Sequence, residues 1–496
     1  MVTSVEQATA VNPKPARLDR SMVRAIAWTG SAQWIAQIFS WISTLYVARA
    51  LTPRDYGVFA MAMLYMGFIS LVSEFGVGSA LIVLRDLGRR QIAELNTLSI
   101  GAGFFWFVIS LAAARAVGAF FSSNELPLVI IVMSAGFLVG SVKVVPDSLL
   151  QQELRFKLLA LLDSVRSLLQ ASATVAAALL GWGYWSLVIG YLLGTTAGTV
   201  LTLAFRRHGF SWPRFRSLKP AMGLSWNLVV IRIGWYLYSN ADILIAGRLL
   251  GETSLGAYRL AWSVSNIPAD KITGMVNRTS QAFFSAVQKE YDALRRYVLA
   301  LTQGLALVAF PASIGMSLVA DQFVSLVLGS KWQEAVIPLR LLTFYVAVRS
   351  VAPLISTVLS VTGQSGFLAR NSVVMSIVMP FGFLMGARWG APGMAAAWVI
   401  MYPICLAPLY WRAFRQIDLS LRQYLAALRV AIGGTLVLTV VVLGLKYSIP
   451  SSTPPVAQLG LQVTAGIVTY VVFIFVFHRS STQKFWQALA LLRNPA

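Results

Sequence analysis

Several basic residues lie inside stretches of the chain that are otherwise apolar and long enough to cross a lipid bilayer, among them Arg232, Arg259, Lys271 and Arg340. An ionised side chain costs about 2.5 to 3.5 kcal/mol at the centre of a membrane helix, so such residues face a water-filled space or a partner. A guanidinium group holds a pyrophosphate or a carboxylate through two parallel hydrogen bonds. These residues predict a cationic cavity that binds an anionic group between membrane helices.

The residues after Arg259 extend this pattern along one face of a predicted helix. Ser263 and Asn266 follow at steps close to multiples of 3.6 residues, and Asp270 continues the same stripe. We expect Ser263 and Asn266 to line the cavity; a stripe packed against another helix is the alternative. Pro268 lies within the stripe and predicts a kink, because proline removes a backbone hydrogen bond.

Acidic residues inside the apolar stretches are fewer. Asp163 and Arg166 are three residues apart and predict an ion pair on one helix. Glu74 and Asp242 have no basic residue within four positions, which makes them candidates, together with Asp270, for coupling transport to a cation or a proton. A partner on a neighbouring helix would be invisible in the sequence, so simple charge neutralisation remains the alternative.

The sequence shows no pattern of catalytic or metal-binding residues. Cys405 is the only cysteine, and the two histidines, His208 and His478, are far apart. The sequence contains no phosphate-binding glycine loop, no nucleophile elbow and no cluster with metal-ligand spacing. We therefore expect no catalytic residue, no metal and no cofactor, and a protein that is not an enzyme.

The elements that position these residues are predicted to be membrane helices. Of 496 residues 57% are hydrophobic and 12% are charged, and the mean hydropathy is +0.71. A spanning helix needs about 20 mostly apolar residues, which predicts about 14 spans. Their approximate cores are 26–48, 57–83, 96–121, 126–149, 158–180, 184–205, 222–247, 256–284, 297–319, 335–360, 367–387, 391–411, 428–446 and 456–477.

The distribution of basic residues predicts the orientation. About 25 of the 40 Lys and Arg fall in connections on the side shared with the two termini, which indicates cytoplasmic termini. The net charge of +22 thus reflects membrane topology and excludes nucleic acid as the expected partner. Arg115, Arg278 and Arg349 are expected to reach a membrane interface with their long side chains.

Two turns in the sequence indicate an internal repeat. Residues 48–59 match residues 247–258 at a constant offset, with Arg49 and Gly57 opposite Arg248 and Gly256. Each turn joins consecutive predicted helices, the first to the second and the seventh to the eighth. A glycine with an aromatic residue in a tight link is common, so chance similarity is the alternative. A true repeat predicts two six-helix lobes that rock about a site between them.

The predicted organisation follows from the spans and the repeat. The chain divides into an N-terminal tail (1–25), an N-lobe (26–205), a basic linker (206–221), a C-lobe (222–411), a second linker (412–427), a terminal helix pair (428–477) and a C-terminal tail (478–496). Gly190, Gly194 and Gly198 recur every four residues on the sixth span, which predicts close packing against a neighbouring helix.

The turn ARALTPRDYG and the segment SNADILIAGRLLGETSLGAY resemble the polysaccharide transporter family, and the resemblance covers most of residues 20–480. That family belongs to the superfamily that includes lipid II flippases and multidrug and toxin extrusion exporters. The resemblance implies a flippase of the bacterial inner membrane. Its implied substrate is an undecaprenyl-pyrophosphate-linked oligosaccharide used for exopolysaccharide, capsule or O-antigen, and its implied partners are membrane lipid and the polymerase and chain-length or export proteins of the same pathway.

Three other functions remain open on the sequence. A lipid II flippase would share the helix number and the cationic cavity. A cation-coupled multidrug exporter would need an acidic cavity and usually has about 12 helices, which the extra pair disfavours. A membrane glycosyltransferase or polymerase is disfavoured because these enzymes typically carry catalytic residues on a large external loop, whereas the longest charged outward link here runs from Asp321 to Glu334.

Overall fold

The computed structural model describes residues 37–73, 78, 81, 87–212, 236–267, 270–450 and 452–477. Within residues 270–286 it describes only some of the side chains. These residues are almost entirely helical, and no β-strand occurs among them. The prediction of an all-α membrane protein is therefore confirmed for the described part of the chain.

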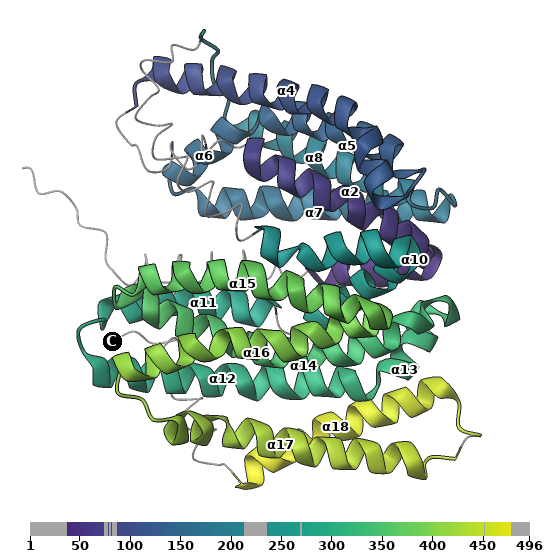
Figure 1. Ribbon diagram of the computed structural model, residues 1–496, viewed down its shortest axis with the longest axis vertical. Helices are drawn as coiled ribbons and strands as arrows, with labels where there is room; N and C mark the ends of the chain where they lie inside the picture. Colours follow the sequence, from purple (N-terminus) through teal and green to yellow (C-terminus); the bar gives the residue numbers. More distant parts are fainter. Residues whose placement is uncertain are drawn as a thin grey trace, which may run out of the picture.

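The helices form two groups that lie one above the other, with α10 between them (Figure 1). The upper group, here the N-bundle, consists of residues 37–50 and of α2 (Pro53–Ser73), α4 (Arg89–Phe121), α5 (Leu126–Ser141), α6 (Val144–Gln152), α7 (Phe156–Leu179) and α8 (Trp185–Phe205). The lower group, here the C-bundle, consists of α10 (Ala241–Asn266), α11 (Asp270–Ala286), α12 (Tyr291–Leu318), α13 (Ala320–Phe323), η1 (Val324–Leu328), η2 (Ser330–Ala335), α14 (Val336–Val361), α15 (Ser365–Gly386), η3 (Ala387–Trp389) and α16 (Gly390–Gln416).

Within the described residues, 9 helical stretches are long and apolar enough to cross a membrane, or 10 if the bent pair α5 and α6 is one span. One of these stretches, Ser365–Gln416, contains both α15 and α16. The predicted spans 335–360 and 391–411 correspond closely to α14 and α16. The total of about 14 and the repeat of two lobes stay predictions, because the first and seventh predicted spans lie partly outside the described residues.

The region of the predicted polar stripe is more broken than the sequence suggested. Gly251 adopts φ 79° and ψ −178° inside α10, which separates its first turns from the segment that carries Arg259. α10 then ends at Asn266 and α11 begins at Asp270, so the span predicted over 256–284 comprises two helices. Pro268 itself lies outside the described residues.

Close packing of α7 against α8 confirms the role predicted for the glycine stripe on α8. A Cβ atom on Gly190 would lie 1.9 Å from Thr174 Oγ1, one on Gly194 would lie 2.7 Å from Gln170 Oε1, and one on Gly198 would lie 2.9 Å from Arg166 Cδ. A side chain at any of the three positions would require α7 or its side chains to shift, most of all at Gly190.

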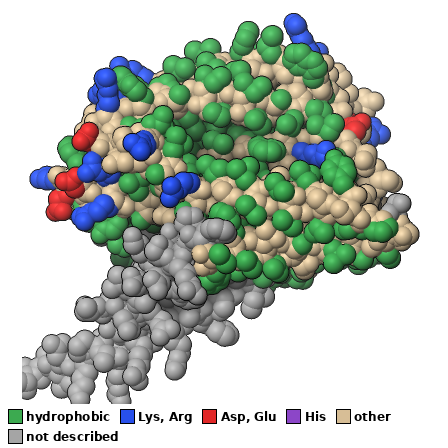
Figure 2. Space-filling view, turned by 90° about the horizontal axis from the view of Figure 1, so that it is seen from below, with side chains coloured by type: hydrophobic (Ala, Val, Ile, Leu, Met, Phe, Trp, Pro, Cys, Tyr) green, Lys and Arg blue, Asp and Glu red, His purple; other side chains and the backbone are tan. Residues whose placement is uncertain are grey.

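The last two helices, α17 (Leu421–Ser448) and α18 (Pro455–Phe477), pack against the C-bundle through α12. Tyr470 on α18 donates to the carbonyl of Leu307 on α12 at 2.7 Å. The face of the molecule seen from the side of this pair is hydrophobic over its middle, and charged side chains gather toward its two ends (Figure 2). This distribution fits a chain surrounded by lipid.

Candidate functional site

Three of the predicted cavity residues lie on α10 between the two bundles (Figure 1). Arg259 is half-buried, Ser263 is exposed and Asn266 is buried. No ion pair to Arg259 occurs among the residues that the structure describes, although Arg259 is close enough to Asp242 to act on it electrostatically. Arg259 is thus a cation inside the helical assembly that no described carboxylate neutralises by direct contact.

Asn266 is engaged by a residue that the sequence did not assign to the site. Arg349 on α14 donates to Asn266 Oδ1 at 3.0 Å, and Asn266 Nδ2 donates to the carbonyl of Trp262 at 2.7 Å. The expectation that Arg349 reaches toward a membrane interface is therefore wrong, because its guanidinium group binds a buried amide. The pairing joins α10 to α14 and could not be read from the sequence, since the two residues belong to different helices.

Asp242 is the centre of a buried hydrogen-bonded group. Its Oδ2 accepts from the hydroxyl of Tyr258 at 2.7 Å and from Nε1 of Trp398 at 3.3 Å, and its Oδ1 accepts from the backbone N–H of Ile243 at 2.8 Å. Trp398 Nε1 also lies 2.9 Å from the Tyr258 hydroxyl. Tyr258 and Trp398 are both at most 3% exposed, so this carboxylate is enclosed by α10 and α16.

An aromatic cluster surrounds this group on the C-bundle side. Trp398 lies with its ring centroid 5.2 Å from that of Trp262, 4.8 Å from that of Tyr345 and 5.0 Å from that of Phe383. Tyr402 extends the cluster, 5.0 Å from Tyr345. These rings hold α10, α14, α15 and α16 together behind Asp242, and such contacts stabilise a core beyond the area they bury.

Arg340 lies elsewhere than the sequence suggested. It forms an ion pair with Asp321, and the same carboxylate accepts from Nζ of Lys446 at 3.0 Å. Arg340 therefore joins α14 to α13, while Lys446 joins the end of α17 to the same point. None of the described polar contacts joins the Arg340 side chain to Arg259 or Asn266.

The remaining candidates lie outside what the structure describes. Arg232 and Glu74 belong to undescribed segments, and Lys271 and Asp270 lie on α11 without described side chains. Their assignment to the cavity or to coupling stays a prediction. Among the described residues, no group of three His, Cys, Asp or Glu side chains could hold a metal ion, and Cys405 is buried.

The four residues of the matched turns all lie where the bundles meet, at one end that we name the joined end (residues 48–57, 120–125, 181–184, 248–256 and 326–335). Arg49 donates to the carbonyl of Leu326 at 2.6 Å, and Arg248 donates to the carbonyl of Phe120 and to Oγ of Ser122. Each arginine thus binds a carbonyl at the end of a helical segment of the other bundle, where backbone oxygens lack helical partners and carry partial negative charge.

The two glycines of the matched turns bring α2 and α10 into backbone contact. A Cβ atom on Gly57 would lie 1.8 Å from the carbonyl oxygen of Glu252, and one on Gly256 would lie 1.7 Å from that of Pro53. No side chain fits at either position. α2 and α10 share the most extensive interface between the bundles for this reason.

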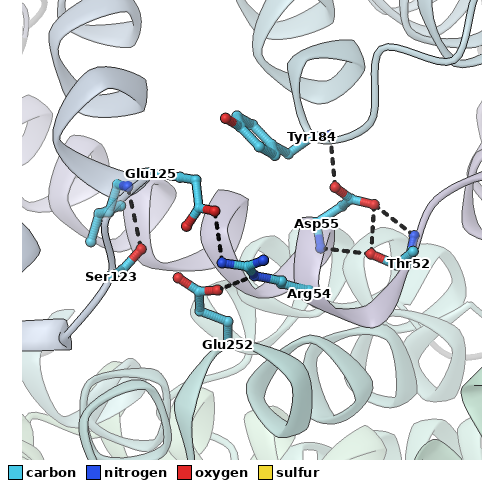
Figure 3. Close-up of polar contacts among 8 residues, drawn as sticks. Thr52, Arg54, Asp55, Ser123, Glu125, Tyr184 and Glu252 are labelled. Carbon is cyan, nitrogen blue, oxygen red and sulfur yellow. Dashed lines mark hydrogen bonds and ion pairs between the residues drawn. The ribbon is translucent and has the colours of Figure 1, made fainter.

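Figure 3 shows a further link at the joined end, which the sequence did not suggest. Arg54 lies between Glu125 and Glu252 and forms ion pairs of 2.7 Å and 2.6 Å with them. Asp55 accepts from the backbone N–H of Tyr184 at 3.0 Å and from Thr52. Arg54 is 59% exposed, so each pair is worth no more than about 1 kcal/mol, but together they connect α2, α5 and α10.

Residues 46–337 match the family described as polysaccharide biosynthesis protein. The chain belongs to this family. It is also similar to the teichuronic acid biosynthesis protein TuaB of Bacillus subtilis, with 24% identity over 94% of this chain and 98% of TuaB. The succinoglycan biosynthesis transport protein ExoT of Rhizobium meliloti is 22% identical over 96% of this chain and 97% of ExoT.

Among solved structures, this member of the polysaccharide biosynthesis family is similar to the lipid II flippase MurJ in an inward closed conformation. The TM-score is 0.75 at 12% identity, and the alignment covers 92% of this chain and 99% of that one. The likeness shows a shared fold. The match to the family model confirms the resemblance seen in the sequence to the polysaccharide transporter family, and the chain is a multi-pass membrane protein.

Proposed function

We propose that this chain flips undecaprenyl-pyrophosphate-linked oligosaccharide units from the cytoplasmic to the outer leaflet of the inner membrane, for exopolysaccharide, capsule or O-antigen. The observation that carries the proposal is Arg259, a cation between the bundles without an ion-pair partner among the described residues. Such a guanidinium group can hold the pyrophosphate of the substrate bidentately. Membership of the family and the relatives named for glycan biosynthesis support this substrate class.

Transport proceeds by alternating access between two six-helix lobes. The reciprocal contacts of Arg49 and Arg248 support this arrangement, because equivalent residues of the two matched turns bind opposite bundles. The joined end faces outward and the termini lie in the cytoplasm, since the basic connections that contain Arg89, Arg155 and Arg412 belong to the other end. The joined end is therefore the part that must separate when substrate leaves outward.

The polyprenyl tail remains largely in lipid and enters the protein only at its first units. An apolar groove of ≈ 460 Å³ lies between α12, α14, α16 and α17 and includes Tyr345 and Trp398 of the aromatic cluster. Its lining is almost free of polar groups apart from hydroxyls such as Ser317 and Thr435. An isoprenoid chain suits such a groove because burying its methyl and methylene groups is favourable.

Asp242 couples transport to a proton rather than to a metal cation. Its oxygens accept from an indole N–H, a hydroxyl and a backbone N–H. The indole nitrogen of Trp398 and the backbone nitrogen of Ile243 carry hydrogen atoms and therefore cannot ligate a metal ion beside Asp242. A proton needs only the carboxylate itself. Protonation would replace an accepted hydrogen bond by a donated one and so disturb the contact between α10 and α16.

The test is flipping of a labelled undecaprenyl-pyrophosphate oligosaccharide by purified chain in proteoliposomes. Arg259→Ala is expected to lose most of the activity, while Arg422→Ala, which removes an exposed arginine on α17, keeps it. Asp242→Asn is expected to keep downhill flipping and to lose acceleration by an imposed pH gradient. Equal activity of Arg259→Ala and Arg422→Ala would exclude the proposed site.

The substrate arm of the same assay addresses the nearest competing function. Lipid II carries the same pyrophosphate linkage and differs in the attached sugar and peptide, so the cationic site alone does not discriminate against it. Flipping of lipid II with no flipping of the oligosaccharide would assign the chain to that function. Chemical turnover of the lipid without translocation would instead indicate an enzyme.

A further inference from the structure

A second cavity lies on the N-bundle, away from the candidate site on α10. Its volume is ≈ 390 Å³, and it lies between the first turns of α4, the break between α5 and α6, the end of α8 and the segment 206–212. Its lining is apolar on α6 and α8 and polar where α4 meets the segment. Its lining residues include Asn96, Pro146, Leu203, Arg207, His208 and Phe210.

The segment 206–212 is held against α4 and α6 by specific contacts. Asn96 Nδ2 donates to the carbonyl of Gly209 at 3.3 Å, and the backbone N–H of Ser211 donates to Thr97 Oγ1 at 3.2 Å. Arg206 forms an ion pair of 2.7 Å with Glu153 at the end of α6. The polar wall of the cavity is therefore built by tertiary contacts and is not a loose surface loop.

Polar atoms around the cavity lack partners. Asn96 is 2% exposed, yet its Oδ1 has no hydrogen-bond partner among the described residues. Because Nδ2 is bound to a carbonyl, the amide is oriented with its acceptor oxygen free. Nε2 of His208 and Nε of Arg206 are also buried and unpartnered in the described structure. Buried polar atoms are nearly always satisfied, so this group indicates a bound molecule.

The surroundings indicate an amphipathic, anionic molecule. Val200 and Phe210 line the cavity and are 60% and 69% exposed, and the neighbouring Trp212 is 86% exposed. These side chains suit the membrane interface. Arg207 supplies a positive charge at the rim, and the carboxylates near the cavity are bound by other arginines: Glu153 by Arg155 and Arg206, and Glu94 by Arg90.

We propose that this cavity binds one anionic glycerophospholipid whose headgroup carries free hydroxyls, of the phosphatidylglycerol type. Its phosphate contacts Arg207, a headgroup hydroxyl donates to Asn96 Oδ1, and an acyl chain follows Leu203 and Val200. A basic pocket between membrane helices at the cytoplasmic side is the usual form of such a site. The bound lipid holds segment 206–212 in place. This segment is the start of the connection that leads from the N-bundle to the C-bundle.

The test uses the purified full-length chain in detergent and follows thermal unfolding by tryptophan fluorescence. Phosphatidylglycerol, phosphatidylcholine, phosphatidylmethanol and inorganic phosphate are titrated separately. Phosphatidylglycerol is expected to raise the unfolding temperature by several degrees, and the other three to do so weakly or not at all. Phosphatidylmethanol keeps the phosphate and lacks the glycerol hydroxyls, so it isolates the contact to Asn96.

Two arginine variants locate the site. Arg207→Ala is expected to raise the phosphatidylglycerol concentration at half-effect by about tenfold, through loss of a charge-assisted hydrogen bond. Arg422→Ala, an exposed arginine far along the chain on α17, is expected to leave it unchanged. Native mass spectrometry of both variants reports how many lipids remain bound and does not depend on thermal stability or on flipping.

Each other outcome overturns a defined part of the proposal. Equal stabilisation by phosphatidylcholine excludes recognition of the anionic headgroup. Stabilisation by inorganic phosphate alone excludes a lipid. An unchanged response of Arg207→Ala excludes this cavity, and equal responses to phosphatidylmethanol and phosphatidylglycerol exclude the hydroxyl contact.

Discussion

Arg49 and Arg248 occupy equivalent positions in two matched turns and bind opposite bundles: Arg49 donates to the carbonyl of Leu326 in the C-bundle, and Arg248 to that of Phe120 in the N-bundle. Both acceptors lie at the end of a helical segment, where carbonyl groups lack partners within the helix. The pairing of the bundles at the joined end is therefore reciprocal, and each turn contributes one cation to it.

Loss of Arg248 is expected to loosen the joined end. A charged hydrogen bond at a helix C-terminus contributes about 1 to 2 kcal/mol, so Arg248→Ala should increase transient opening by roughly tenfold. The measurement is the rate of maleimide labelling at Ala335→Cys, a buried position of the joined end, in a Cys405→Ser background. Arg388→Ala, an exposed arginine of η3, is the control; equal labelling rates in the two variants would contradict the assignment.

Alanine at Gly57 or Gly256 is expected to destabilise the protein. The added methyl group would meet a backbone carbonyl that cannot rotate away, and overpacking of this kind costs about 1 to 3 kcal/mol. Thermal unfolding in detergent should therefore shift downward by several degrees. Gly304→Ala is the matched control, because a Cβ there has no neighbour within 4 Å and alanine favours the helix. A similar downward shift for the control would remove the steric explanation.

The three-residue cluster at Asp321 predicts unequal effects of its members. Lys446→Ala leaves the pair of Asp321 and Arg340 and should cost little, whereas Asp321→Asn leaves two cations facing each other and should cost about 1 kcal/mol. Unfolding temperatures of the two variants at low salt test this order. Asp163→Asn, which removes a pair 4.0 Å long with an exposed carboxylate, should have no effect; equal losses in all three would show that the cluster has no special role.

The pKa of His208 is lowered from its ordinary value of 6.5, first by burial and then by the charges of Arg206 and Arg89. The folded-state pKa is below that of the unfolded chain, so unfolding takes up a proton between the two values. Stability contributed by neutral His208 is therefore complete above about pH 6.5 and falls as the pH drops through that window. Unfolding temperatures of wild type and His208→Gln, compared from about pH 8 to about pH 5, should converge at low pH. Parallel curves would contradict the lowered pKa.

The helices could be predicted from the sequence wherever the signal was local. The apolar stretches over 335–360 and 391–411 recur as α14 and α16, and the pair of Asp163 with Arg166 formed as their spacing predicted. Hydropathy and helical spacing act over a few residues, so they can be read without knowing the fold. A local signal also stood near the interruption between α10 and α11, because Pro268 predicted a kink in the span 256–284.

The candidate site was predicted less well, because its polar contacts join different helices. Arg340 and Arg349 look alike in the sequence, because both are isolated cations within the apolar stretch 335–360. One forms an ion pair with Asp321 on α13 and the other donates to Asn266 on α10, and neither contact could be read from the sequence. Tyr258 and Trp398 were missed as partners of Asp242 for the same reason. Arg259 has no ion-pair partner among the described residues, and its assignment to a cavity stays a prediction.

The contact between Gly57 and Gly256 limits how the protein can diversify. The two bundles touch there through main-chain atoms, which point mutations cannot change. Almost any side chain introduced at this contact is therefore harmful. On the proposed function, adaptation to a different cargo must then occur at side chains away from this contact, such as the exposed Ser263 of α10. On the proposed function, a lineage can in this way replace its cargo specificity while inheriting the contact between its bundles unaltered.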